Sequence, residues 1–262
     1  DTHVSMLPKV NIEGGGGLPP GSAMGGYDFT LDAGEFVQIS QQAPLTGSVL
    51  ASDKPIGFMG GDRCSQVPQG VYACDHIEQM IPPIRALGHE YVGVAHRSRS
   101  GEPARWRLIG VLDGTQLSWS ADIGGPSSLS AGQVVEFAST FPFVVRSQNK
   151  EYPFVVMSYM TGGSVNGMNG VGDPEGVLVV PPVQYLNEYV FFADPTYPET
   201  NLVVVRAPAN DQLHKVYLDC AGELGDWTAL GDFEFTRVDL STGDFEAVGN
   251  CSLGAHRMWS DG

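Results

Sequence analysis

The stretch IPPIRALGHEYVGVA at residues 81–95 returns as VPPVQYLNEYVFFAD at residues 180–194. In both copies a Pro-Pro pair precedes a leucine, a tyrosine and an apolar run that ends in alanine. Proline marks turns, and runs of valine, phenylalanine and tyrosine favour β-strands. Each copy is therefore predicted to be a turn that leads into a strand, and the two copies to hold matching places in an internal repeat.

A second motif, in which a leucine stands three residues before a glycine, supports the repeat. Its copies are LDAGEF at 31–36, LSAGQV at 129–134 and LSTGDF at 240–245. A predicted strand that ends in serine follows each copy; these serines are Ser52, Ser147 and Ser260. Two different motifs that recur in one order are not expected from chance similarity among turns. The chain is thus predicted to form a first, partial unit at 1–80, a second at 81–179 and a third, partial unit at 180–262, together one compact module.

The predicted fold class is all-β, with internally repeated β-sandwich-like units of about 100 residues and little helix. Short apolar or alternating runs lie between turns rich in glycine and proline, as expected for strands. Strands are expected at Phe36–Ser40 and Ile56–Met59, among others. Helical turns are expected only at Ile77–Met80 and Arg85–Leu87.

The repeat also indicates open sheet edges. The first unit has no counterpart of the Pro-Pro strand, and the third stops soon after Ser260. Unpaired edges promote association with other strands. We therefore expect either a longer protein around these residues or a partner chain that completes the edges by strand addition.

Composition excludes several classes of partner. The 262 residues include 14 Lys and Arg against 30 Asp and Glu, a net charge of −16. Binding to a phosphate backbone or to anionic lipid needs clustered basic residues, so neither nucleic acid nor a membrane surface is expected as a partner. No apolar run reaches the roughly 18 residues that span a bilayer, so membrane insertion is not expected either.

The four cysteines lie as two local pairs, Cys64 with Cys74 and Cys220 with Cys251. An even number without a C-x-x-C motif favours two disulfides and an oxidising compartment. Three connectivities are possible, and the local pairing is favoured. Free buried thiols and a metal site that includes His76 are the alternatives; thiolate zinc sites usually show C-x-x-C-type spacing, which is absent here.

Acidic loops provide the candidate metal ligands. Calcium takes six to eight oxygen ligands, often from carboxylates and carbonyls. Asp173 and Glu175 lie in one loop, and Asp194 and Glu199 in another. They are candidate calcium ligands; alternatively they are solvated turn residues that keep the chain soluble. The same carboxylates could serve a glycan hydrolase only if two of them faced each other across a cleft. No other cofactor is expected.

Loops also provide the candidate binding residues, because recognition sites often use exposed aromatic and adaptable side chains. Tyr197 and Trp227 are the aromatic candidates, and Asn166 and Met168 lie in the long loop 162–173. For Trp227 the alternative is packing under a Cys220–Cys251 bridge.

The sequence resembles a known family most clearly over Ser52–Ala95. GSVLASDKPIGFMGGDRC at 47–64 and VPQGVYACDHIEQMIPPIRALGHEYVGVA at 67–95 are similar to the N-terminal domain of the IgG Fc-binding, mucin-like proteins of animal mucus. The same domain occurs in large secreted proteins of myxobacteria, and DPTYPETNLVVV at 194–205 resembles that bacterial branch. The resemblance implies an extracellular β domain used for binding or adhesion, with bridges Cys64–Cys74 and Cys220–Cys251. It supplies no catalytic residues.

These observations predict a secreted or cell-surface, non-enzymatic module that recognises a protein or a glycan. The alternative is a structural protomer of an extracellular filament or matrix, in which copies of the chain fill each other's edges. A glycan-acting hydrolase is a remote alternative, because the chain has no G-x-S-x-G, H-E-x-x-H, P-loop or EF-hand motif.

Overall fold

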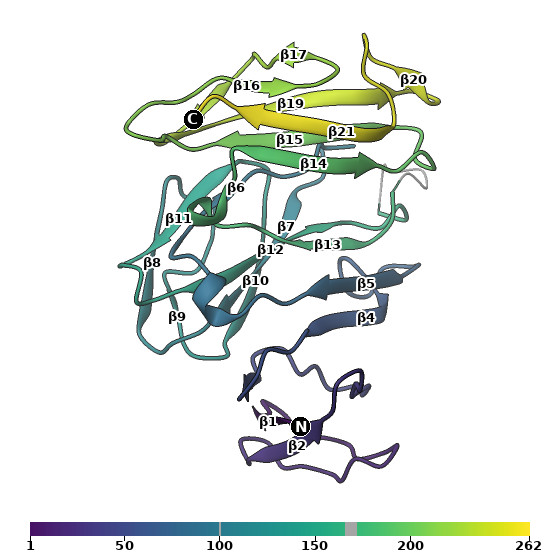
Figure 1. Ribbon diagram of the computed structural model, residues 1–262, viewed down its shortest axis with the longest axis vertical. Helices are drawn as coiled ribbons and strands as arrows, with labels where there is room; N and C mark the ends of the chain where they lie inside the picture. Colours follow the sequence, from purple (N-terminus) through teal and green to yellow (C-terminus); the bar gives the residue numbers. More distant parts are fainter. Residues whose placement is uncertain (100, 166–171) are drawn as a thin grey trace.

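The computed structural model describes residues 1–99, 101–165 and 172–262. These residues form antiparallel sheets, and their only helical elements are two 3-10 turns, η1 (Ile84–Ala86) and η2 (Pro182–Gln184). The sheets succeed one another along the long axis of the molecule, from the N-terminus to the C-terminus (Figure 1). The prediction of an all-β fold is confirmed.

The N-terminal part holds a three-stranded sheet and a hairpin. The sheet has the order β2-β1-β3, and the hairpin pairs β4 with β5. Their bounds are β1 (Thr2–Leu7), β2 (Tyr27–Leu31), β3 (Val49–Ser52), β4 (Met59–Ser65) and β5 (Asp75–Met80). Met6, Ile12 and Tyr27 form the small core under this sheet.

The middle part is a sandwich of two four-stranded sheets with orders β6-β11-β8-β9 and β10-β7-β12-β13. The bounds are β6 (Glu90–Gly93), β7 (Ala104–Gly110), β8 (Thr115–Trp119), β9 (Ser128–Leu129), β10 (Val134–Ser139), β11 (Phe143–Ser147), β12 (Phe154–Met160) and β13 (Glu175–Leu178). Side chains from both sheets share one core, in which Trp106 meets Phe143 edge-on at 4.8 Å. This is the largest buried cluster of the chain's described residues.

The C-terminal part has sheets of orders β14-β21-β16-β17 and β15-β19-β18, with β20 paired to β19. The bounds are β14 (Glu188–Ala193), β15 (Thr200–Arg206), β16 (Val216–Leu218), β17 (Gly222–Glu223), β18 (Thr228–Leu230), β19 (Phe233–Thr242), β20 (Glu246–Ala247) and β21 (Gly254–Ser260). Leu218, Leu240 and Cys251 lie in the core between these two sheets.

Three sheets share one strand register around the predicted serines. Ser52 pairs with Val4, Ser147 with Leu117 and Ser260 with Val216. Each serine ends its strand, as predicted. In each motif with the leucine three residues earlier, the glycine has a positive φ, +86° at Gly34, +66° at Gly132 and +61° at Gly243, which favours glycine over residues with a side chain. The equivalence of whole units, and their boundaries at 80/81 and 179/180, stay predictions.

Three local predictions were wrong. Ile77–Met80 lies in strand β5 and is not helical: Ile77 is buried beside Tyr159, and β5 pairs with β4. Phe36–Ser40 forms no strand, and Phe36 is 83% exposed. Ile56–Met59 meets a strand only at its last residue, where β4 begins. Strand-forming composition was present at the last two sites, but no described strand lies alongside to pair with the segments.

Candidate functional site

The candidate site is one face of the sheet β14-β21-β16-β17. Successive side chains of a strand point to opposite faces of its sheet. The inward-facing side chains pack in the core, as Ala193 and Leu218 do. We call the opposite side the outer face; it consists of Glu188, Val190, Phe192, Tyr217, Ala255, Arg257 and Trp259, which the strand pairing places side by side.

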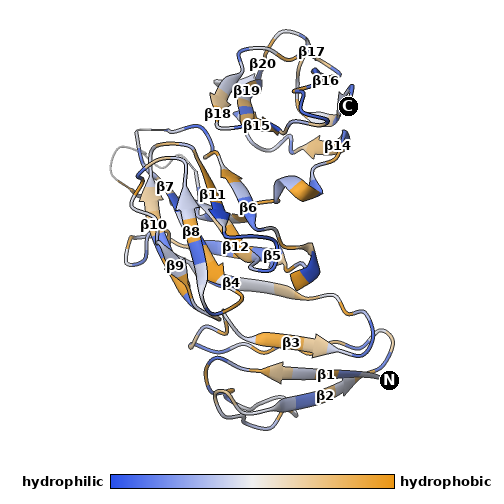
Figure 2. Cartoon of the chain, turned by 90° about the vertical axis from the view of Figure 1, so that its left-hand side faces the viewer, coloured by the Kyte–Doolittle hydropathy of each residue, from blue (hydrophilic) through white to orange (hydrophobic). Residues whose placement is uncertain are grey.

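The outer face is apolar and open. Val190 is 77% exposed and Phe192 67% exposed, although both lie within a regular strand. Figure 2 shows β14 as a hydrophobic strand at the side of the molecule, near the C-terminus. Isolated exposed apolar residues are common, but a contiguous apolar patch is typical of an interaction surface.

Aromatic and charged side chains complete the outer face. The rings of Tyr217 and Trp259 stack with their centroids 5.6 Å apart, and the Arg257 guanidinium lies 5.2 Å from the Trp259 ring. Arg257 Nε donates a hydrogen bond of 2.7 Å to Glu188 Oε1. This bond and the charge of Arg257 lower the pKa of Glu188, and the same bond and the charge of Glu188 raise the pKa of Arg257. Arginine and tryptophan are the residue types that dominate the energetics of protein interfaces.

Charge on this side of the sheet is locally balanced. Lys215 Nζ lies 2.7 Å from Glu223 Oε2, next to the outer face, and the hydrogen bond raises the pKa of Lys215. Together with Arg257 and Glu188, these residues form two ion pairs on a chain whose net charge is −16. An acidic partner can therefore approach the outer face with less repulsion than it meets elsewhere.

The counterpart of the outer face in the middle part is covered. In the sheet β6-β11-β8-β9, Val92 and Val144 are only 3% and 1% exposed. Phe233 packs directly on them, and Val205 and Leu230 pack around the same cluster. All three covering residues belong to the sheet β15-β19-β18, so one sheet of the C-terminal part docks on the outside of the middle sandwich.

The counterpart in the N-terminal part is open and polar. On the sheet β2-β1-β3, Ser5 Oγ donates a hydrogen bond of 2.6 Å to Asp28 Oδ1, and His3 pairs with Thr30. Side chains His3, Asp28 and Thr30 are exposed. The covered counterpart is thus apolar and the open counterpart polar. The outer face is open yet apolar, which is the composition of a surface that docks against protein.

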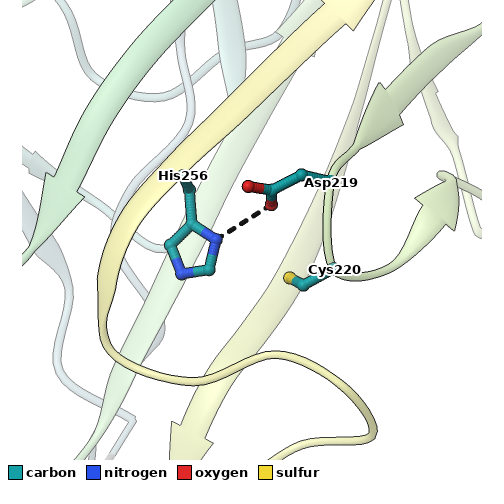
Figure 3. Close-up of side chains that lie close together, drawn as sticks. All are labelled: Asp219, Cys220 and His256. Atoms are coloured by element: carbon teal, nitrogen blue, oxygen red, sulfur yellow. Dashed lines mark hydrogen bonds and ion pairs between the residues drawn. The ribbon is translucent and has the colours of Figure 1, made fainter.

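A buried histidine near this sheet looks like a metal site but is not one. Asp219, Cys220 and His256 have ligand atoms within 4.8 Å of one another, the one such group of three found among the described residues (Figure 3). The Cys220 sulfur is bonded to Cys251, so it cannot act as a thiolate ligand. His256 Nδ1 lies 2.9 Å from Asp219 Oδ1 and Nε2 lies 2.7 Å from the Ser252 carbonyl, so both ring nitrogens are occupied.

The His256–Asp219 pair is instead a structural ion pair. Burial alone lowers the pKa of His256, but the hydrogen bonds to Asp219 and Ser252 and the charge of Asp219 outweigh it and raise the pKa. Burial likewise raises the pKa of Asp219, and the bonds from His256 and the Arg257 N–H outweigh it and lower the pKa. The pair fixes β21 to the loop after β16, next to the disulfide.

Both disulfides have the favoured pairing, Cys64–Cys74 and Cys220–Cys251. Two bridges fit an oxidising, extracellular location. Cys251 is 3% exposed and belongs to the C-terminal core, whereas the Cys64–Cys74 bridge is exposed at the end of the β4–β5 hairpin. His76, beside Cys74, lies 3.1 Å from Glu78 and takes no part in a ligand group among the residues that the structure describes.

The predicted aromatic residues lie in different environments. Tyr197 is 61% exposed in the loop between β14 and β15. Trp227 is half-buried: its Nε1 donates a hydrogen bond of 3.0 Å to the Leu224 carbonyl, and the Arg206 guanidinium lies 4.0 Å from its ring. The Trp227 ring packs on the core that contains Cys251. Asn166 and Met168 lie outside the described residues.

The four candidate calcium ligands are exposed. Asp194 Oδ1 accepts hydrogen bonds of 2.8 and 2.7 Å from the N–H and hydroxyl of Thr196, and Glu175 Oε1 accepts one of 2.7 Å from Gly176. Among residues 1–99, 101–165 and 172–262, neither Asp173 nor Glu199 joins a group of three close metal ligands. Calcium binding stays a prediction.

Sequence reasoning missed the outer face. The run YVFFA at 189–193 was predicted to be a strand, which is correct. The signal for exposure was that apolar residues occupy successive positions, so both sides of the strand are apolar. Such a run also describes a strand buried on both faces. Only the positions of the neighbouring sheets distinguish the two cases.

Comparison with known proteins identifies the family of the chain. No solved structure matches the chain. The human IgGFc-binding protein is 27% identical over 235 residues, which are 86% of this chain but only 4% of the human protein. None of the described helices has the length and apolar character required to cross a membrane. The family model described as IgGFc binding protein matches residues 1–262, and the chain therefore belongs to this family.

Proposed function

We propose that the chain is an extracellular, non-enzymatic module that binds another protein through the outer face. The observation that carries the proposal is the contrast between the three related sheets. Val92 and Val144 are apolar and covered, Ser5 and Asp28 are polar and open, and Val190 with its neighbours is apolar and open. Two disulfides support an extracellular location.

A protein ligand fits this surface better than a glycan. On the middle sandwich, the surface around Val92 and Val144 is covered by the sheet β15-β19-β18 of the same chain. A flat, apolar protein surface therefore fits a sheet face of this kind. The strands β14, β21, β16 and β17 have six, seven, three and two residues, and with a rise of about 3.3 Å per residue and a spacing of about 4.8 Å the outer face has an area on the order of 300 Å². Stable complexes bury about 800 Å² per partner, so this face alone supports a transient contact.

The first ligand to test is IgG Fc, because the human relative is named for binding it. Binding is measured by surface plasmon resonance on immobilised Fc. The test variant carries Val190→Ser and Phe192→Ser, which remove the two most exposed apolar side chains of the outer face. The matched control carries Phe36→Ser and Tyr72→Ser, whose side chains are 83% and 88% exposed and lie outside the outer face.

The proposal expects the outer-face variant to lose at least tenfold in affinity and the control to stay within twofold of the parent. Both variants are expected to keep the parental circular-dichroism spectrum, since all four side chains are exposed. Equal affinity of the two variants would sink the outer face as the binding surface. If the parent protein does not bind Fc, Fc is not the ligand. The same variants are then tested on a glycan array, and glycan binding that the outer-face variant loses would mean that the ligand is a glycan and not a protein.

A structural protomer is the second candidate function. It is supported by β14 and β15, which lie at sheet edges and are bonded on one side only among the described strands. Light scattering over a concentration series tests it. Growing particle size in the parent, absent from a variant with a charged edge, supports assembly, and a constant size contradicts it.

A further inference from the structure

Strands β15 and β7 hold equivalent places in the chain. Each follows a strand that begins after a Pro-Pro turn, β6 for β7 and β14 for β15. Each precedes a strand that pairs with a serine-ended strand, β8 for β7 and β16 for β15. Each also lies in the second sheet of its sandwich and packs against the first. The two strands can therefore be compared edge by edge.

The edges differ. Strand β7 is bonded on both sides, by β10 and by β12. The β12 pairing runs from Phe154 opposite Gly110 to Tyr159 opposite Arg105. Strand β15 is bonded by β19 alone among the strands that the structure describes. In the middle part the added strand β12 is the one that follows Ser147, the serine equivalent to Ser260 in register.

The core-facing side chains of the two strands also differ in burial. The core-facing residues of β7 are completely enclosed, with Trp106 1% and Leu108 0% exposed. Facing the C-terminal core from β15, Val204 is 7% exposed and Leu202 only half-buried. A strand added beside β15 would remove the remaining apolar surface from water, which stabilises by roughly 25 cal/mol for each Å².

Over Leu202–Val205 the free edge of β15 has no proline, charge or bulge that would oppose pairing. Natural edge strands are usually short, or interrupted by charge or proline. Strands β9 and β17 have two residues each, and β18 has three. By contrast β15 has seven residues, with the unbroken aliphatic run Leu202–Val205 and a bulge only at Thr200/Asn201.

We propose that the free edge of β15 binds an extended apolar segment of a partner protein by antiparallel strand addition, as β12 completes β7. Main-chain hydrogen bonds would supply the affinity, and side chains on both faces the selectivity. The segment should carry apolar residues at successive positions. Its side chains on one face of the sheet meet the core beside Leu202, and those on the opposite face extend the apolar surface that contains Val205. Strand β12, FVVMSYM, is the example that the chain itself provides. This site is separate from the outer face and does not depend on the function proposed for it.

The test uses the complete chain and a synthetic peptide with the sequence KEYPFVVMSYM of residues 150–160. Binding is followed by fluorescence anisotropy and located by amide hydrogen exchange. We expect saturable binding, with at least tenfold slower exchange at alternate amides of Leu202–Val205. Faster exchange in β12 without protection of β15, which would mean that the peptide displaces β12, or no binding at all, overturns the proposal.

Two N-methylated peptides provide the matched control. Methyl groups on alternate residues block the hydrogen bonds of one edge of the added strand, and methyl groups on the remaining residues block the other edge. One set is expected to reduce affinity at least tenfold and the other to leave it within threefold. Equal affinity of the two sets would mean ordinary hydrophobic adhesion and overturns strand addition.

Sedimentation velocity distinguishes a second copy of the chain as the occupant. A dimer that the peptide dissociates would mean that two β15 edges pair with each other, and it contradicts the choice of a separate partner. The variant with Val190→Ser and Phe192→Ser is expected to bind the peptide like the parent. The outcome at β15 is therefore distinguishable from the outcome at the outer face.

Discussion

Trp259 and Tyr217 stand opposite each other on neighbouring strands and stack with an interplanar angle of 16°. The shared register places Arg146 and Ser118 at these positions in the middle part, and Ala51 and Ser5 in the N-terminal part. Neither of those pairs is aromatic. The sheet does not require the stacked pair, because the other two sheets form without one. We therefore expect the pair to contribute to ligand binding at the outer face.

Replacing Trp259 by alanine is expected to weaken ligand binding more than folding. An aromatic pair contributes about 0.5–1.5 kcal/mol, and Trp259 is only half-buried, so the free energy of unfolding should fall by about 1 kcal/mol. Affinity for a ligand of the outer face should fall at least tenfold. Urea unfolding and surface plasmon resonance measure the two quantities. Tyr217→Phe keeps the ring and serves as control; a loss of stability without a loss of affinity would contradict a binding role.

The His256–Asp219 ion pair is expected to make stability depend on pH. The raised pKa of His256 adds stability that is complete below its unfolded value near 6.5 and lost as pH rises through the folded value. The lowered pKa of Asp219 adds stability that is complete above about 3.9 and lost as pH falls through its folded value. The contribution of the pair should therefore be greatest between about pH 4 and 6.5.

Thermal unfolding at pH 5.5 and pH 8 checks this expectation. Asp219→Asn should remove most of the difference that the pair causes and cost roughly 1–3 kcal/mol at pH 5.5, because His256 is buried and would lose its charged partner. His3→Gln is the control, since His3 is exposed and 4.0 Å from Asp28. If Asp219→Asn leaves the pH dependence of the parent intact, another group is responsible.

Reduction should affect the two disulfides unequally. Loop-closure entropy gives about 3.7 kcal/mol for the 31-residue separation of Cys220–Cys251 and about 2.7 kcal/mol for the 10-residue separation of Cys64–Cys74. Cys251 is also buried in the C-terminal core, so its bridge is less accessible to reductant. Double alanine variants of each pair, unfolded in urea, should show the larger loss for Cys220 and Cys251. The reverse order would mean that the bridges act mainly on the native state.

Local patterns carried most of the fold. The Pro-Pro turns, the serine-ended strands and the two local disulfides could be predicted because each depends on residues that are near in sequence or on a repeated motif. Strand β5 was missed because IEQM at 77–80 has too little strand-forming composition and takes its structure from pairing with β4. Its partner is fixed by tertiary context, which outweighs local propensity.

The candidate site was less predictable for a related reason. Val92 and Val190 each follow the tyrosine of a Pro-Pro motif, yet one is 3% and the other 77% exposed. The difference arises from Phe233 and its neighbours, which cover only the first. No feature within either strand encodes it, since it depends on which sheet docks on the outside. Trp227, the other aromatic candidate, lies under the Arg206 guanidinium and on the C-terminal core, and its role in binding stays a prediction.

The tyrosines of the two Pro-Pro motifs can be compared directly. Tyr91 and Tyr189 each accept a hydrogen bond from the N–H three residues earlier, from Gly88 at 3.0 Å and from Leu186 at 2.9 Å. Tyr91 is 1% exposed, and its hydroxyl also donates a bond of 2.6 Å to the Phe154 carbonyl. Burial raises the pKa of Tyr91 to about 12, so the hydroxyl keeps its proton across the working range of pH.

Tyr91→Phe should therefore cost roughly 1–3 kcal/mol, because a buried N–H and a buried carbonyl lose their partner. Tyr189→Phe should cost less than about 1 kcal/mol, because Tyr189 is 41% exposed and water can replace the hydroxyl. Urea unfolding of the two variants measures the difference. Equal costs would mean that the turn, and not the burial of the hydroxyl, sets the energy of this motif. A larger cost at Tyr91 would identify the core between the two sheets of the middle sandwich, where the hydroxyl bonds Phe154 of β12, as the source.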